Sequence, residues 1–488
     1  MSETTLQVVE TLPPRPEDIS QNYINTGAAA LRVFLTFEVS GEAAIFELAH
    51  KDRQENKELF LNDLVRNPVF NNCPKFTLET AKRAEQSKNL REALFMHQLL
   101  GAETPEPSLE LKQAGDMIAH RLNELSFIDA AAMLAANQLL PDERTQVAAI
   151  LRATGRELYG MPDKPQALAD IKSIVVKADE YAAQPEHPLV TIAQELQQLV
   201  VLDAQTEVSQ PVTLSEVDIN YYYEILNEEC QPALDYAFED FNDTEIFTVE
   251  EMQIIFTKYC EFRGFSAAGL VVKIIPNRVM CATKDEPYVI EIGSKRPAGQ
   301  RDRKSVTKSL IHEAEGHAGR IFRGRQLGSG LAGFGLKRHE IFEEALCGTL
   351  GDIVYKTADP KGEMLVMAIA LAAGYDSGQD RDCRANFEAL WRLYVVKNYK
   401  ADKDIDKQLA TARSKAWGLT ERIWRGMPTD VPGCIYAKDA AYRNITNVIP
   451  YLQGTDGPLA KADFLRLLQA KYDPTIPDQD AYIRQLTS

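Results

Sequence analysis

The sequence predicts a predominantly helical α+β fold in which a small sheet packs beside a helical half. Two observations support this prediction. From about Gly27 to Leu202, alanine- and leucine-rich segments repeat apolar residues three and four positions apart, as in IDAAAMLAANQLL at 128–140. Further along, short β-branched runs are bounded by Gly, Pro and Asn, which is typical of strands.

Three regions follow from the order of these patterns. Residues 1–20 carry three prolines among acids and are expected to form a disordered leader. Residues 21–205 form a helical N-terminal region. A polar stretch at 203–218 reads as a linker, and residues 206–488 form the second main region.

The second region contains the expected sheet. LVVKIIP at 270–276 and PYVIEIG at 287–293 are predicted strands, and RVMCAT at 278–283 is a third. Helical periodicity returns after residue 304. An α+β segment therefore follows the all-helical one.

Composition excludes several classes of protein. The 488 residues include 71 acids and 54 basic residues, a net charge of −17, which argues against nucleic acid or an anionic membrane as the main partner. The seven cysteines form no CxxC pair and fit reduced thiols. The N-terminus lacks the pattern of a signal peptide, and the longest apolar run, Met364 to Ala373, is half the length that spans a bilayer. We therefore expect a cytoplasmic protein, of a size that suggests two or three domains; its oligomeric state is left open.

The most informative segment is TKSLIHEAEGHAGRIFRG at 307–324, which contains His312, Glu313 and His317 in an HExxxH arrangement. Imidazoles are the commonest zinc ligands, and an adjacent carboxylate can deprotonate metal-bound water. An ideal α-helix would place residues five apart about 140° apart around its axis, too far for one metal ion. A π-bulge, with about 4.4 residues per turn, would return both histidines to one face, and Gly316 lowers the cost of that distortion. Two unrelated histidines on a polar helix are the alternative.

A third ligand is expected from a second helix. HEIFEEALCGTLGDIV at 339–354 offers Glu343 and Glu344 about thirty residues downstream. Two strands followed by a helix that bears a histidine pair is also a common architecture of zinc peptidases. The pattern alone leaves both carboxylates open, and a solvated helix face is the alternative for each.

The motif and its neighbours resemble the HExxxH metallopeptidases of the tyrosine carboxypeptidase family, whose bacterial members carry a QEGLA-type motif. HEAEGHAGRIFRG followed by FEEALC carries the resemblance. Three further segments agree in order: NDLVRNPVF at 62–70, RELYGMPD at 156–163, and RGMPTDVPGCIYAKDAAYRN at 425–444. The similar segments span residues from about 60 to 445.

The resemblance implies a zinc-peptidase-like catalytic half in residues 206–488, with one zinc ion. Its ligands would be His312 and His317, and Glu313 would be the catalytic acid and base. Aligning QEGLA on EEALC places the family's single glutamate at Glu344, with Glu343 in reserve. The chain departs from the family at Cys347, where Ala is usual, and at Arg323, where Asn is common; these changes affect the expected substrate preference.

The late segment supplies candidates for stabilising the oxyanion that forms when water attacks a peptide carbonyl. These are Tyr442 and Lys438, which fall in the part that resembles the family's Gly-x-Phe-Thr-Lys-Asp-x-x-Tyr stretch. A packed tyrosine and a surface lysine are the alternatives.

A basic stretch brackets the motif. Between residues 295 and 338, eleven basic residues face three acids, a local charge of +8. Arginine binds carboxylates through paired hydrogen bonds, so we expect Arg320 and Arg323, one and two turns past the second histidine, to hold a substrate's terminal carboxylate. A solvated face is the alternative. The predicted function is a zinc carboxypeptidase acting on peptide or protein C-terminal tails, with an aromatic last residue implied only by the resemblance. A non-catalytic zinc-containing regulator or scaffold and an endopeptidase are the alternatives.

Overall fold

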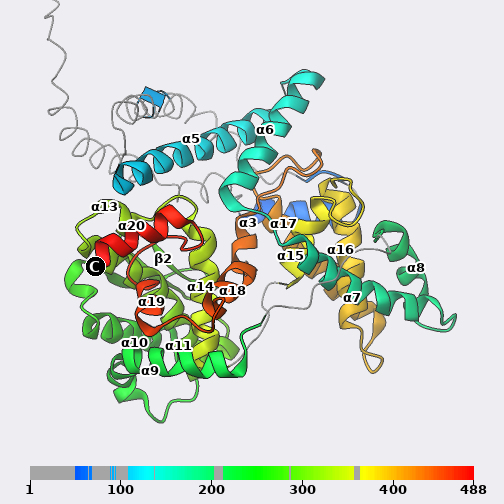
Figure 1. Cartoon of the computed structure of the whole chain (residues 1–488). Helices are drawn as coiled ribbons and strands as arrows, with labels where there is room; N and C mark the ends of the chain where they lie inside the picture. Colours follow the sequence, from blue (N-terminus) through cyan, green and yellow to red (C-terminus); the bar gives the residue numbers. More distant parts are fainter. Residues whose placement is uncertain are drawn as a thin grey trace, which may run out of the picture.

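A computed structural model of the chain describes most of it from residue 108 onward (Figure 1). The described residues are 50–63, 65–68, 88, 91, 92, 94, 108–136, 138–202, 213–284, 287–356, 363–443 and 445–488, with backbone alone at 50–53 and 441–447. The predicted leader at 1–20 lies outside them. The fold is predominantly helical with one small mixed sheet, as the sequence predicts.

Two halves share the described residues, and each has its own buried apolar core. The sheet half consists of residues 213–356 and 445–488 and lies to the left in Figure 1. The helical half consists of residues 108–202 and 363–443 and lies to the right and top. Helix α5 (Leu109–Ala135) contributes to both, because Met117 is buried in the first core and Phe127 in the second.

The sheet half surrounds a three-stranded sheet. Strands β1 (Val271–Ile275), β2 (Cys281–Lys284) and β3 (Val289–Gly293) lie in the order β1-β3-β2; β1 is parallel and β2 antiparallel to β3. All three predicted strands are confirmed. The central strand β3 is buried along its whole length because it has neighbours on both edges, whereas β2 is an edge strand beside the predicted metal-binding segment.

The rest of the sheet half is helical, with helices that precede and follow the three strands along the chain. They are α9 (Glu216–Phe238), α10 (Val249–Phe262), α11 (Arg303–Leu310), α12 (Gly319–Gln326), α13 (Gly330–Phe334), α14 (His339–Val354), α18 (Ile445–Gln453), α19 (Lys461–Arg466) and α20 (Pro477–Thr487), with short 3₁₀ turns η1 (Glu239–Phe241), η2 (Ser266–Ala268) and η3 (Ala298–Gln300). Side-chain caps fix several starts: Asp302 begins α11 by accepting a hydrogen bond from the Ser305 backbone N–H, and Thr248 begins α10 in a capping box with Glu251.

The helical half is built from two separate stretches of chain. Its elements are α5, α6 (Pro141–Tyr159), α7 (Lys164–Ala182), α8 (Val190–Leu199), α15 (Glu363–Ala372), α16 (Cys383–Asn398), α17 (Ile405–Ile423) and the 3₁₀ turn η5 (Lys438–Arg443), with α3 (His50–Leu61) packed against them. Helix α15 is almost wholly buried, so most of the apolar run at 364–373 forms a core helix. No helix of the described residues is long and apolar enough to cross a membrane.

The predicted division between residues 205 and 206 does not follow the cores. Helices α15 to α17 lie in the predicted second region, yet they bury their apolar faces against α5 to α8 of the first. The polar composition at 203–218 suggested a boundary, but which apolar faces meet is decided by packing between distant segments. Among the described residues, the six cysteines are buried and form no disulfide; Cys73 lies outside.

Candidate metal centre

The HExxxH segment is a π-helix, as helical geometry predicts. The segment η4 (Ile311–Ala318) continues α11 and passes into α12 without a break in the helix. The backbone N–H of Gly319 bonds to the carbonyl of Ala314, five residues earlier, which is the π-helical pattern. The prediction that the helix is distorted between the two histidines is therefore confirmed.

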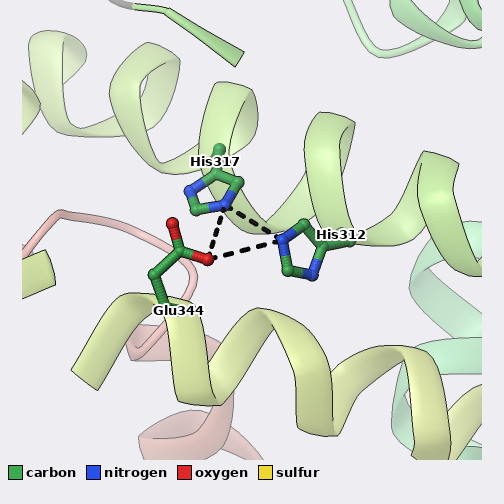
Figure 2. A group of neighbouring side chains, drawn as sticks. All are labelled: His312, His317 and Glu344. Carbon is green, nitrogen blue, oxygen red and sulfur yellow. Dashed lines mark hydrogen bonds and ion pairs between the residues drawn. The ribbon is translucent and has the colours of Figure 1, made fainter. Parts of the chain in front are cut away.

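The distortion brings three predicted ligands together (Figure 2). Nε2 of His312 lies 3.2 Å from Nε2 of His317, and Oε2 of Glu344 lies 3.6 Å from the first and 3.8 Å from the second. Both histidines come from η4, and Glu344 comes from α14, which runs alongside (Figure 2). The three atoms form a nearly equilateral triangle.

Ligand atoms about 2.0–2.2 Å from a tetrahedral zinc ion lie about 3.3–3.6 Å from one another, which is close to this triangle. One further observation agrees with a cation. Oε2 of Glu344 is buried and has no hydrogen-bond partner, an arrangement that costs free energy unless a ligand completes it. Burial alone raises the pKa of Glu344, but His317 and His312 lower it by more, so the carboxylate is in its anionic, ligating form.

The neighbouring carboxylate of α14 has a different place. Oε1 of Glu343 lies 2.9 Å from Nδ1 of His317, and this contact fixes the ring with Nε2 toward the triangle; a proton held on Nδ1 by Glu343 would leave the Nε2 lone pair for a metal ion. Burial raises the pKa of Glu343, but Lys471 and His317 lower it well below its usual range. Its other oxygen lies 3.5 Å from His339. Of the two carboxylates that the sequence left open, Glu344 completes the triangle and Glu343 orients a histidine.

Close approach of α14 to the π-helix depends on Gly316. A Cβ atom at this position would lie 2.3 Å from the Cys347 sulfur. The same sulfur lies 3.9 Å from Nδ1 of His317. The glycine therefore serves packing against α14, a role that the sequence argument about helix distortion did not foresee.

The predicted acid/base, Glu313, follows His312 directly and is buried. Its Oε2 accepts a hydrogen bond of 2.8 Å from Oγ1 of Thr283, and the same hydroxyl lies 3.0 Å from the Glu313 carbonyl oxygen. Thr283 belongs to the edge strand β2. The edge strand thus holds this carboxylate in place, a contact that the sequence analysis did not predict.

The two oxyanion candidates fall in η5, which packs against α14. Nζ of Lys438 lies 3.2 Å from Oε2 of Glu340, one turn before Glu344 on α14. The side chain of Tyr442 lies outside the described residues, so its predicted role stays a prediction.

The prediction that Arg320 and Arg323 hold a substrate carboxylate is contradicted. Arg320 is fully buried, and its Nε and Nη2 donate to the carbonyls of Ala470 and Tyr472 at 2.7 and 3.0 Å. Nε of Arg323 donates to the carbonyl of Leu468 at 2.7 Å. Both guanidinium groups hold the C-terminal segment, because their helix positions face the protein interior.

Other members of the basic stretch also have protein partners. Lys308 pairs with Asp352 at 2.7 Å, Lys337 pairs with Glu157 at 2.8 Å, and Arg301 donates to the Phe247 carbonyl. Much of the local charge of +8 is therefore used to join elements of the fold.

No protein-family model, curated protein or solved structure matches this chain. The resemblance to tyrosine carboxypeptidases accordingly stays a prediction from short motifs. The segments that carry it do meet in the structure: Tyr159 packs against Tyr436 with ring centroids 5.2 Å apart, and Thr429 donates to the Pro68 carbonyl.

Proposed function

We propose that the protein is a zinc-dependent peptidase whose metal ligands are His312, His317 and Glu344. One observation carries the proposal: two imidazole nitrogens and one unpartnered, buried carboxylate oxygen converge at 3.2 to 3.8 Å from one another. Three protein ligands with nitrogen and oxygen donors are typical of catalytic zinc sites, which keep a fourth position for water or substrate.

A bound zinc ion would activate a water molecule and polarise the carbonyl of a peptide bond. The residues of the chain supply the remaining chemistry. Glu313 takes the proton from the attacking water and returns it to the leaving amine. Thr283 holds the Glu313 carboxylate, and Glu343 holds His317 with its Nε2 toward the ligand triangle.

Lys438 is the described candidate for stabilising negative charge at the carbonyl oxygen, together with Tyr442. Its ion pair with Glu340 places it against the helix that bears Glu344. A cation fixed by a neighbouring carboxylate needs little reorganisation when charge develops nearby, which is the condition for electrostatic stabilisation.

The proposed substrate is the C-terminal tail of a peptide or protein, with loss of one residue. The family resemblance supports this choice, with tyrosine or another aromatic residue as the leaving group. The bonds of Arg320 and Arg323 to carbonyls of the C-terminal segment occupy the expected carboxylate clamp and favour, as a second candidate, an endopeptidase with the same site. A non-catalytic zinc protein is a third; the retained Glu313 argues against it, because a structural zinc needs no base.

The deciding experiment compares one peptide with a free C-terminus and the same peptide amidated, using protein with measured zinc content. Amidation removes the terminal charge that an exopeptidase binds. Cleavage of the free peptide alone is expected. Equal cleavage of both would favour the endopeptidase, and zinc-loaded protein inactive on a broad set of free peptides would favour the non-catalytic alternative.

A further inference from the structure

A second carboxylate of the π-helix points away from the ligand triangle into a cluster of buried charges. Oε1 of Glu315 lies 2.6 Å from Nε of Arg263 and accepts a hydrogen bond of 2.9 Å from the Tyr259 hydroxyl. Its Oε2 lies 2.9 Å from Nη2 of Arg323. We call these four residues, Glu315, Arg263, Arg323 and Tyr259, the Glu315 cluster. The Glu315 side chain is fully buried, yet both of its oxygens have partners.

The π-helical register places the two histidines on one face and directs Glu315 toward the cluster on another face. At about 4.4 residues per turn, Glu315 is about 115° from His312 and about 165° from His317 around the axis, while the histidines are about 50° apart. In an α-helix Glu315 would be only about 60° from His312, and the histidines would be about 140° apart. A carboxylate held in the interior therefore favours the register that turns both imidazoles outward to the metal.

Contacts to the backbone strengthen this effect. A π-helical turn disturbs the regular ladder, and the carbonyls of this segment accept hydrogen bonds from side chains instead. Nη2 of Arg323 lies 3.3 Å from the carbonyl oxygen of Glu315, and the Tyr288 hydroxyl donates to the carbonyl of Ala318 at 2.8 Å. Arg323 thus bonds both the side chain and the backbone of Glu315.

Both guanidinium groups of the Glu315 cluster have this carboxylate as their acidic partner, Nε of Arg263 at 2.6 Å and Nη2 of Arg323 at 2.9 Å. Removing the carboxylate would leave two largely buried guanidinium groups without their acidic partner, and loss of one member of a buried ion pair is strongly destabilising. A change of the π-helical register would then lower the free energy of the segment.

From this geometry we infer that Glu315, Arg263, Arg323 and Tyr259 are positioning residues that hold the π-helix in the register in which His312 and His317 share one metal ion. The inference rests on the proposed metal site for its use in function, but the register itself is measurable without metal. Neither arginine is assigned contact with substrate.

The metal-free test replaces both histidines with cysteine, His312→Cys and His317→Cys, in a Cys347→Ala background that removes the neighbouring thiol. Cα atoms five residues apart in an α-helix are about 8.7 Å from each other, beyond the limit of about 7 Å for a disulfide, so only the distorted register allows the bond. We expect ready formation of this disulfide under mild oxidation, mapped by mass spectrometry. Adding Glu315→Gln should slow it about tenfold or more.

The metal-dependent test measures zinc affinity by chelator competition in otherwise natural protein. Glu315→Gln should weaken zinc binding about tenfold, the lower end of what loss of an orienting partner costs, and Tyr259→Phe should weaken it less. Tyr259→Phe keeps the ion pairs and serves if the first variant does not fold. The matched control is Asp376→Asn, which breaks a buried two-pronged pair with Arg381 in the helical half. This control should lower the unfolding temperature without changing zinc affinity.

The outcomes separate the two proposals. Unchanged disulfide formation and unchanged zinc affinity in Glu315→Gln would overturn the positioning role. Equal loss of zinc affinity in Asp376→Asn would also overturn it, since the effect would then be general destabilisation. If the unaltered protein bound no zinc, the proposed metal site would fail, while the disulfide test would still decide whether the Glu315 cluster sets the register.

Discussion

The π-helix meets a carboxylate on each of two faces, and the oxygens of the two carboxylates have different partners. On the ligand face, Glu344 of α14 meets His312 and His317 with one oxygen that has no hydrogen-bond partner. On the interior face, both oxygens of Glu315 are occupied by Arg263, Arg323 and Tyr259. A carboxylate oxygen that lacks a hydrogen-bond partner beside two imidazoles indicates a place for a ligand. A carboxylate whose two oxygens both have protein partners indicates a structural role.

The same comparison explains why the basic stretch at 295–338 does not have the substrate-binding role that its charge suggested. Its charge of +8 lies around the motif, as a substrate-binding surface would. Arg320 and Arg323 of this stretch instead donate hydrogen bonds to backbone carbonyls, and Arg323 also donates to the buried Glu315 carboxylate. Local charge in a sequence therefore does not reveal whether a group faces solvent or the interior.

The largest effect is expected from removing a ligand. His312→Ala or His317→Ala should abolish stoichiometric zinc binding, because two protein ligands rarely hold zinc tightly. Elemental analysis after dialysis measures this. His187→Ala, which removes a histidine stacked on Tyr181 in the helical half, should keep full zinc content. Full occupancy in both ligand variants would refute the assignment of the ligand face.

Glu313→Gln should separate metal binding from turnover. The variant keeps both histidines and Glu344, so zinc content and fold should be unchanged. Loss of the general base should lower kcat by about 10²- to 10⁴-fold on a peptide that the unaltered protein cleaves. Asp352→Asn, two turns beyond Glu344 on α14 where Asp352 pairs with Lys308, is the control for a charge change nearby. Near-normal turnover in Glu313→Gln would contradict the proposed mechanism.

The two adjacent carboxylates of α14 should differ in degree. Glu343→Gln weakens the hydrogen bond to Nδ1 of His317 and should reduce zinc affinity about 10- to 100-fold. Glu344→Gln should reduce it further, because it removes a charged ligand. Chelator competition on both variants ranks them. The reverse order would exchange the roles of the two residues.

The smallest effect concerns the contact between the π-helix and α14. Gly316→Ala places a methyl group against the Cys347 sulfur and should lower the free energy of unfolding by about 1–3 kcal/mol. Cys347→Ala in the same chain should restore part of the loss. Gly348→Ala is the control, since a Cβ there meets nothing within 4 Å. Denaturant unfolding measures the stability of all three variants. Equal stability of Gly316→Ala and the control would show that η4 and α14 can move apart to admit the methyl group at no cost.

Several features of this protein were determined by the sequence alone. The five-residue spacing of His312 and His317 requires a distorted helix if one metal ion is to bind both, because helical angles follow from spacing. The three strands follow from short β-branched runs between turn residues. The proposed ligand role of Glu344 came from the resemblance of its motif to a known family, and its position in the triangle agrees with that prediction.

Tertiary structure decided the rest, because these features depend on which distant segments meet. Glu343 and Glu344 are neighbours in sequence, and only the angle at which α14 approaches η4 assigns one to the triangle and the other to His317. The interior direction of Arg320 follows from packing against the C-terminal segment. The two cores mix early and late helices in the same way, since burial rewards any apolar faces that fit, however far apart they lie along the chain.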